Sequence, residues 1–505
     1  MPKFAAKILD LELDEKVILN RKDAKKLKVD IETRLLLKSK KSDTLKEIIL
    51  TDSLVQPGQV GLTPQIQEML MIKENDIIDV SSKDEPKSFP YLSRMLDGEK
   101  LERDEILAIV QDIVSRNLSE VEMSAFILAQ YFRDITMDEI EALTRATAET
   151  GQVIDFDEPV YDKHSIGGVP GNKVSLLIVP IVAAAGLPIP KTSSRAITSP
   201  AGTADTFEVL APVEFSADEL VQLIKKVRGA LVWGGTLNIA PADDILIDVV
   251  EHPLKIDPVS QMLSSIMSKK IAVGVDALVL DIPIGIGTKV PNKDAATELS
   301  RKFVELGTRL NVRVEIGITY GDQPVGHAIG PALEAKEALE SLMGGKKSTS
   351  LVEKSIALAG MLIEMSGKTA RGQGRILAKE ILNSGKALEK MKEIIDAQGG
   401  NPNIKPDDIQ SGEHRVDIPA PVAGYIVEVN NISINEIAKA AGAPDHKGAG
   451  LYIYKKRGGY VKRGEPLLTI YSETASKLRE AQSLVVKLEP ITIEGMLLKR
   501  VSAYY

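Results

Sequence analysis

The segment KHSIGGVPGNK, residues 163–173, and the segment TSSRAITSPAGT, residues 192–203, flank an apolar run, Val174–Leu187. The apolar run has the length and composition of a buried helix. Both flanking segments combine small residues, which let main-chain N–H groups approach a ligand closely, with hydroxyl groups and a cation. Two such loops beside one helix predict a binding site for a phosphate group. An ordinary tight turn between a strand and a helix is the alternative for each loop.

The pattern around these loops predicts an α/β domain. Beyond Val153, apolar strand-like runs at 230–233, 277–280 and 312–319 alternate with helical patterns at 218–228 and 295–306. We assign this domain to residues 156–239 and 273–410. The helical patterns before and between these segments predict one helical domain made of residues 87–155 and 240–272. Its buried stripes are expected to run from Leu101 to Ile113 and from Met123 to Tyr131.

The two ends of the chain are rich in strand patterns. Residues 1–86 alternate apolar and polar side chains, and helix-then-strand pairs at 23–37 and 64–80 resemble each other. A pseudo-duplicated β-rich domain explains this echo, and chance similarity is the alternative. Residues 411–505 resemble the barrel-sandwich module of biotinyl and lipoyl domains but lack a carrier lysine motif, so we expect a structural role. The expected fold class is therefore α/β plus an all-α domain, with a β-rich N-terminal domain and an α+β barrel-sandwich-like C-terminal domain.

Composition excludes several classes of function. The 505 residues, 44% of them hydrophobic, suffice for several domains with their own cores. A net charge of −8, with 63 scattered Lys and Arg residues, argues against a nucleic-acid-binding surface. The lack of Cys excludes thiol nucleophiles and disulfides, and the five His residues show no metal-ligand spacing, so we expect no metal site. Without a signal-peptide pattern or a membrane-spanning run, the chain is expected to be soluble, cytoplasmic and without a membrane partner.

The two loops carry a resemblance to a known family. Lys163-His164-Ser165-x-Gly167-Gly168, followed by Ser193-x-Arg195 and Gly202-Thr203-x-Asp205, resembles the signature of the thymidine and pyrimidine nucleoside phosphorylases over roughly residues 90–500. The longer form of both segments is similar to a branch of that family that acts on AMP and has an extra N-terminal domain. The resemblance implies a nucleoside phosphorylase class II architecture and a phosphorolysis reaction, in which phosphate attacks the anomeric carbon while the base departs.

The resemblance also implies which residues bind phosphate and nucleotide. One ammonium and four hydroxyls, which suit a dianion without any cofactor or metal, match the phosphate ligands: Lys163, Ser165, Ser175, Ser193 and Thr203. His164 matches a catalytic histidine beside the base and sugar, and a packing histidine after a strand is the alternative. The positions matching nucleotide contacts in these loops are Gly168, Ser194, Arg195, Ala196, Ile197, Thr198, Ser199 and Thr203.

Residues further along the chain match the base site. Ser265 and Lys269 are one helical turn apart, so both can face one cleft, and in the family this helix contacts the base. Asp257 matches the catalytic proton donor of the AMP branch, a role that requires a raised pKa and hence partial burial. A helix N-cap is the alternative for Asp257. Val250 stands where pyrimidine enzymes carry an arginine, which puts strict thymidine specificity in doubt. Lys289 matches a nucleotide contact in the AMP branch and could meet a 5′-phosphate, and a solvated loop lysine is the alternative.

The leading hypothesis is therefore a nucleoside 5′-monophosphate phosphorylase, a pentosyltransferase that converts AMP and phosphate to adenine and ribose 1,5-bisphosphate, with CMP and UMP as further candidate substrates. A thymidine or pyrimidine nucleoside phosphorylase is the second hypothesis, and a non-catalytic nucleotide-binding scaffold is the third. The resemblance implies a homodimer that packs through the helical domain. Larger assemblies could form through the N-terminal domain.

Overall fold

The computed structural model describes residues 2–11, 16–31, 34–82, 86–196, 199–345 and 349–498. It divides into two compact units, Met1–Gly151 with Ala240–Ser265, and Gln152–Ile239 with Ile266–Tyr505. The expected division into four domains is finer than this and stays a prediction. Across the described ranges, the structure contains no helix that is both long and apolar enough to cross a membrane.

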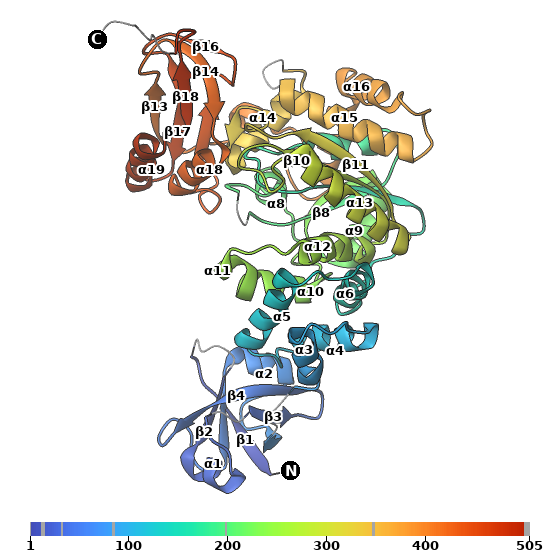
Figure 1. The fold of residues 1–505 in the computed structure, drawn as a ribbon, viewed down its shortest axis with the longest axis vertical. Coiled ribbons are helices and arrows are strands. Elements are labelled where there is room, and N and C mark those ends of the chain that lie inside the picture. The colour runs from blue at the N-terminus through green and yellow to red at the C-terminus, as the bar shows by residue number, and fades with distance from the viewer. Residues whose placement is uncertain are drawn as a thin grey trace, which may run out of the picture. The chain divides into compact units, whose positions relative to one another are not determined.

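A closed six-stranded barrel forms the start of the first unit (Figure 1). The chain runs twice through the same order of strand, strand, helix and strand, which confirms the internal echo. The first half holds β1 (Lys3–Ile8), β2 (Val17–Asn20), α1 (Arg21–Leu27) and β3 (Arg34–Lys38). The second half holds β4 (Asp43–Thr51), β5 (Gln59–Leu62), α2 (Pro64–Leu70) and β6 (Ile77–Ser82). The Asn20 and Thr63 side chains cap the equivalent helices α1 and α2.

The strand pairing interlocks the two halves of the barrel. The order around the barrel is β1-β5-β2-β4-β3-β6, with β6 returning to β1. Among the described residues, each of the six pairings joins a strand of one half to a strand of the other. Neither half therefore contains a sheet of its own.

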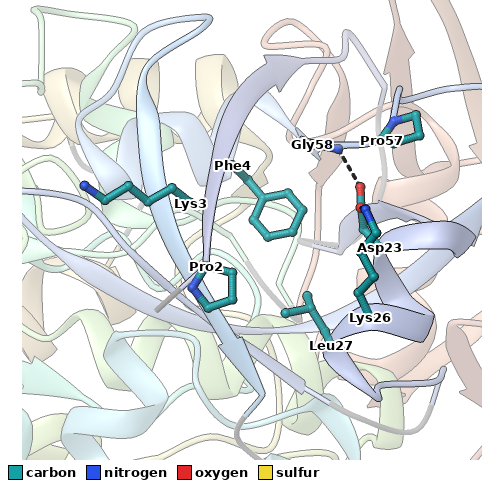
Figure 2. Close-up of a pocket in the computed structure, with 8 residues that line it drawn as sticks. All are labelled: Pro2, Lys3, Phe4, Asp23, Lys26, Leu27, Pro57 and Gly58. Atoms are coloured by element: carbon teal, nitrogen blue, oxygen red, sulfur yellow. Dashed lines mark hydrogen bonds and ion pairs between the residues drawn. The ribbon is translucent and has the colours of Figure 1, made fainter.

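A cavity of about 360 Å³ lies at the barrel near the N-terminus. In Figure 2, the Asp23 carboxylate accepts a hydrogen bond from the Gly58 backbone N–H (2.5 Å) at the edge of this cavity. Its lining holds none of the predicted site residues, so it is separate from the predicted chemistry. The lining residues are Pro2, Lys3, Phe4, Asp23, Lys26, Leu27, Pro57 and Gly58.

The rest of the first unit is helical, and two separate chain segments share its core, as the sequence predicted. Its helices are α3 (Phe89–Leu96), α4 (Arg103–Val114), α5 (Glu120–Phe132), α6 (Met137–Glu149), α10 (Pro241–Leu246), a π-helical turn (Ile247–Glu251), α11 (His252–Leu254) and the start of α12 (Val259–Ala272). Ile109 and Phe126 pack in one cluster with Leu246 from the second segment. The expected stripe on α5 ends one residue early, because Gln130 takes the buried face and Tyr131, 53% exposed, points away.

Parallel strands and covering helices form the α/β part of the second unit, as predicted. Strands β11 (Arg313–Tyr320), β10 (Val275–Ile284) and β7 (Val160–Ser165) form one sheet, and β8 (Ile189–Ser193) pairs with β9 (Gly229–Trp233). The Tyr161 N–H donates to the Pro188 carbonyl (2.9 Å), which holds the start of β7 beside the entry to β8. The helices are α7 (Ser175–Ala184), α8 (Thr203–Phe207), α9 (Ala217–Val227), α13 (Lys293–Arg309), α14 (Pro331–Leu342), α15 (Thr349–Met365), α16 (Gly374–Asn383) and α17 (Lys386–Ala397).

The C-terminal part consists of two small sheets and two helices. Strands β13 (His414–Pro419), β15 (Gly450–Ile453) and β17 (Pro466–Ser472) form one sheet, and β14 (Gly424–Val429), β16 (Tyr460–Val461) and β18 (Ile491–Glu494) form the other. Helices α18 (Asn431–Ala440) and α19 (Ala475–Leu488) pack with them. The first sheet also includes β12 (Ala328–Ile329), which lies outside the range 411–505 expected for this part. A strand of two residues leaves no periodic pattern from which it could be predicted.

Candidate active site

Strand β7 ends in the first predicted loop and carries charged side chains on both faces. Because side chains alternate along a strand, Lys163 and Ser165 face one side and Asp162 and His164 the other. The carboxyl ends of the parallel strands β7 and β10 lie side by side, with Ser165 directly opposite Asp281 in the register. The two faces of β7 therefore build two charged clusters within one unit.

The first cluster centres on Asp281, which is fully buried. The Ser165 hydroxyl donates to Asp281 Oδ2 (2.6 Å), and the Thr319 hydroxyl donates to Oδ1 (2.5 Å). The ammonium of Lys354, from α15, lies 2.8 Å from Oδ2. Burial alone would raise the pKa of Asp281, but Lys354 and Lys163 and the hydrogen bonds hold it below its usual range. Burial lowers the pKa of Lys163 to about 8, against the opposing pull of Asp281.

The second cluster centres on Asp162, on the opposite face. The ammonium of Lys270, from the part of α12 in this unit, donates to Asp162 Oδ2 (2.6 Å), and Lys191 lies 3.7 Å from Oδ1. Burial, and then repulsion by Lys270 and Lys163, lowers the pKa of Lys191 to about 7, although Asp162 opposes the shift. Burial, and then the neighbouring lysines, hold the pKa of His164 well below its usual value. The His164 imidazole is therefore neutral at neutral pH.

Cations outnumber acids around the end of β7. Two aspartates, Asp162 and Asp281, are surrounded by lysines that perturb one another's charge: Lys163, Lys191, Lys269, Lys270 and Lys354. Such an excess of buried positive charge attracts an anion and stabilises it in a low-dielectric site. Within the described ranges, no group of His, Asp and Glu side chains is arranged to hold a metal ion.

The second predicted loop, between β8 and α8, is closed by Asp205. Its Oδ2 accepts the backbone N–H groups of Ala196 (2.7 Å) and Gly202 (3.0 Å), which draws the two ends of the loop together. A side chain at Gly202 would lie 2.6 Å from the Ser194 carbonyl oxygen, so only glycine fits. Loop residues Ile197 and Thr198 lie outside the described residues. Ser193 ends β8, Thr203 begins α8 and the buried Ser175 begins α7, so the predicted phosphate ligands come from element ends.

Arg195 acts as an anchor of this loop. Its guanidinium binds both carboxylate oxygens of Glu208 (2.8 Å each) and lies 4.7 Å from the ring centre of Trp233. The hydrogen bonds and charge of Glu208 raise the pKa of Arg195, and Arg195 in turn helps lower the pKa of Glu208 to about 2. The sequence predicted a nucleotide contact at Arg195. In the structure, the contacts of Arg195 with Glu208 and Trp233 hold the loop in place.

The third predicted element, the loop after β10, touches the first. A Cβ atom at Gly168, whose φ is +106°, would lie 3.1 Å from the Lys289 backbone nitrogen and 3.3 Å from Thr288 Cα. The Thr288 hydroxyl bonds within its own loop, to the Gly285 carbonyl (2.9 Å). The side-chain amide of Asn431, on α18, donates to the carbonyls of this region at Ile286 (3.3 Å) and Gly321 (2.7 Å). The C-terminal part thus holds the loop that carries the exposed Lys289.

The residues predicted to meet the base lie on or near α12. The Ser265 hydroxyl donates to the buried Asp243 (2.8 Å), which fixes its position within the first unit. Lys269 follows one turn later, in the part of α12 that belongs to the second unit. Whether the two side chains share one cleft stays a prediction. Val250 is fully buried in the helical core, inside the π-helical turn. Its apolar side chain has no hydrogen-bond donor to offer a base.

Asp257 lies on the segment between α11 and α12. The partial burial expected of a proton donor is not found, because Asp257 is exposed. The chain leaves α11 through Lys255 in the left-handed conformation (φ +55°) and crosses the surface of its unit before Pro258. The Pro258 carbonyl accepts the Met262 N–H (2.9 Å), which is the first backbone bond of α12. The N-cap alternative for Asp257 stays a prediction.

Sequence reasoning missed the residues that support the first loop from behind. Asp281 carried a signal, since it is an acid that interrupts the apolar run 277–284 of β10. Nothing in the local sequence around Lys354 or Thr319 indicated that they would contact Asp281. A further buried cation, Lys173, lies 2.7 Å from Glu337 Oε2 and donates to the carbonyls of Gly171 (2.9 Å) and Ala328 (2.8 Å). It ties the first loop to β12, and through β12 to the C-terminal sheet.

Comparison with known proteins matches this architecture. Residues 157–388 match the α/β domain of a glycosyl transferase family, residues 89–151 match the helical bundle domain of that family, and residues 425–492 match the pyrimidine nucleoside phosphorylase C-terminal domain. Anthranilate phosphoribosyltransferase from Thermus thermophilus has a similar fold over 61% of this chain and 98% of its own, with a TM-score of 0.52 at 23% identity. These matches confirm the predicted α/β and helical parts.

Relatives of nearly full length are also found. The AMP phosphorylase of Methanosarcina mazei is 53% identical over 492 residues, which cover 97% of this chain and 96% of the relative. The AMP phosphorylase of Thermococcus kodakarensis is 50% identical over 96% of both chains. That of Methanocaldococcus jannaschii is 46% identical over 99% of both chains.

Proposed function

Because the chain belongs to the AMP phosphorylase family of glycosyl transferases, we propose that it catalyses the phosphorolysis of AMP to adenine and ribose 1,5-bisphosphate. The observation that carries this proposal is the cluster of buried lysines at the carboxyl end of β7, where the Ser165 hydroxyl also lies. An anion is the ligand that such a site favours. Phosphate is an anion and the nucleophile of the reaction.

The phosphate side of the reaction uses the ends of β7, β8, α7 and α8. Lys163 supplies the charge, and Ser165, Ser175, Ser193 and Thr203 orient the phosphate oxygens toward the anomeric carbon. As the bond to the base breaks, the sugar gains positive charge, and the bound phosphate stabilises it. Neutral His164 beside this sugar avoids the repulsion that an imidazolium would add.

The base side of the reaction is assigned to residues on α12 and on the segment before it. Ser265 and Lys269 contact the base, and Asp257 donates a proton to the departing nitrogen. Asp257 is exposed in the structure, so we propose that bound nucleotide covers it before the proton is transferred. In this proposal the segment from Lys255 to Pro258 takes part in the reaction only when nucleotide is bound.

The 5′-phosphate of the nucleotide is assigned to Lys289. The loop that carries Lys289 contacts Gly168, so the 5′-phosphate and the nucleophilic phosphate would bind neighbouring loops. A pyrimidine nucleoside phosphorylase is the second candidate, favoured by the match of residues 425–492 to that family's C-terminal domain. The buried Val250, which offers no donor, speaks against a pyrimidine-specific contact at that position.

A substrate panel tests the proposal. The purified protein is incubated with phosphate and, separately, with AMP, CMP, UMP, adenosine or thymidine, and the released base is quantified. We expect AMP to react fastest, with CMP and UMP as further candidate substrates. Turnover of thymidine without any turnover of monophosphates would favour the second candidate, and no turnover at all would favour a nucleotide-binding scaffold.

The role of Lys289 is tested separately. Lys289→Ala should lower kcat/KM for AMP by about tenfold or more, the size of one lost charged hydrogen bond, and change adenosine turnover much less. Lys293→Ala, which removes another exposed lysine at the start of α13, is the matched control. Equal losses for AMP and adenosine in the Lys289 variant would refute the assignment.

The homodimer, larger assemblies through the N-terminal barrel, the cytoplasmic location and the lack of a cofactor stay predictions. Sedimentation of the full chain tests the first two.

A further inference from the structure

We infer that Asp281, acting through Ser165, makes the phosphate site recognise the proton of hydrogen phosphate, so that the site selects phosphate and arsenate over sulfate. This inference rests on the proposed function, in which Ser165 binds the attacking phosphate. It assigns Asp281 a positioning role and names the anions that the site accepts.

A short hydrogen bond and the strand pairing hold the side chains of Ser165 and Asp281 together. Ser165 Oγ lies 2.6 Å from Asp281 Oδ2, and the backbone carbonyl of Asp281 also accepts the Ile166 N–H (2.9 Å). Asp281 is fully buried and lies opposite Ser165 in the pairing of β7 with β10. Residue 281 therefore holds the end of β7 with both its main chain and its side chain.

The cations beside Asp281 keep it ionised. Lys354 lies 2.8 Å from Oδ2, and the charge of Lys163 acts on the same carboxylate. An ionised carboxylate only accepts hydrogen bonds. The single hydroxyl proton of Ser165 must therefore point at Asp281, and it is not available to a ligand.

A ligand that contacts Ser165 therefore faces the lone pairs of the hydroxyl oxygen and not its proton. A hydroxyl whose proton is committed offers only acceptor capacity, so a matching ligand must donate. Hydrogen phosphate carries one P–OH group and can donate it to Ser165, while its other three oxygens face the lysine and the remaining hydroxyls. Hydrogen arsenate has the same arrangement. Sulfate carries no proton at neutral pH, so a sulfate oxygen would face the Ser165 lone pairs without a hydrogen bond.

This arrangement also orients the nucleophile. The protonated oxygen is the weakest nucleophile of the four, and Ser165 holds it on the side of β10. The unprotonated oxygens are then the ones presented to the sugar.

Anion binding without nucleotide provides the test, because it does not depend on turnover. Calorimetric titrations with phosphate, arsenate and sulfate give three affinities for the wild type and for each variant. We expect the wild type to bind phosphate and arsenate at least about tenfold more tightly than sulfate, because the loss of one hydrogen bond to a buried polar group lowers affinity by about that factor. In Asp281→Asn the amide can donate to Ser165 and release its proton, so the phosphate-to-sulfate ratio should fall by about tenfold or more.

Two further variants separate recognition from a general structural effect. Thr319→Val removes the other hydroxyl on Asp281 (2.5 Å from Oδ1) and leaves Ser165 untouched, so the ratio should not change. Ser165→Ala removes the hydroxyl that accepts the hydrogen bond from phosphate. Because Ser165 lies at the partly exposed end of β7, this variant is expected to fold. It should lower the phosphate-to-sulfate ratio even if Asp281→Asn fails to fold.

The outcomes distinguish this inference from the proposed function. Equal wild-type affinities for phosphate and sulfate, or an unchanged ratio in both Ser165→Ala and a folded Asp281→Asn, would overturn the inference while AMP phosphorolysis stands. Selective binding of phosphate by a protein that releases no base from AMP would leave the anion selectivity in place and overturn the proposed function.

Discussion

Replacing the buried Lys173 by Met is expected to destabilise the second unit by about 3–5 kcal/mol, the cost of removing one partner from a buried ion pair. The Lys173 side chain is 0% exposed, and Glu337, 2.7 Å away, is 5% exposed. Met preserves most of the apolar stem but leaves the carboxylate buried without its Lys173 counter-ion. The carbonyls of Gly171, Val325 and Ala328 lose the same donor.

The single tryptophan of the chain makes this loss measurable. Trp233 lies in the second unit, so its fluorescence during urea unfolding reports on that unit alone. Lys225→Met is the matched control, since Lys225 pairs with Asp157 at 2.9 Å while the two side chains are 51% and 86% exposed. An exposed pair is worth about 0–1 kcal/mol, so the control should unfold close to the wild type.

A double variant identifies the cause. Glu337→Gln removes the uncompensated charge, so Lys173→Met combined with Glu337→Gln should be less destabilised than the sum of the two single variants. A loss for Lys173→Met as small as that of Lys225→Met would refute the reasoning. Additive losses in the double variant would also refute it, because they would show that the two side chains do not interact.

Three further predictions concern single groups. Asp257→Asn should lower kcat for AMP by about a hundredfold, within the range of general acid catalysis, with nucleotide binding retained in a calorimetric titration; near-normal turnover would remove Asp257 from the donor role. His164 should show no ionisation between pH 6 and 8 in an NMR titration, because burial and the lysines lower its pKa, and a midpoint in that range would contradict this. Burial raises the pKa of Glu334 to about 7, so the folded state holds this proton more tightly than the unfolded state, and the stability that Glu334 contributes is lost as the pH rises toward and through 7. Glu334→Gln should therefore raise the Tm, relative to the wild type, more at pH 8 than at pH 5, and equal differences would contradict the shift.

Local patterns predicted where several of the candidate residues lie in the fold. Lys163, Ser165 and Ser193 stand where apolar strand runs give way to glycine and hydroxyl residues, and the structure places them at the ends of β7 and β8. Ser216, directly before the amphipathic run of α9, caps that helix by accepting the Glu219 N–H. These features depend on neighbours in sequence, so the sequence contains the information.

Contacts between distant segments could not be predicted in the same way. Lys354 approaches Asp281 from α15, and Lys173 reaches Glu337 on α14, although neither lysine differs from a surface lysine in its local pattern. The exposure of Asp257 depends on how α11 ends. A helix of three residues leaves no periodic pattern from which its end could be predicted. Long-range packing and the conformation of short connections decided each of these.

The interlocked barrel at the N-terminus also sets an order of events during synthesis. Residues 3–38 leave the ribosome first, and every described partner of β1, β2 and β3 lies in residues 43–82. Until those residues emerge, three strands expose unpaired N–H and C=O groups, which are edges that another chain can pair with. Closure of the barrel therefore depends on non-local pairing. If two copies exchange halves, we expect the exchange to begin while these edges are unpaired.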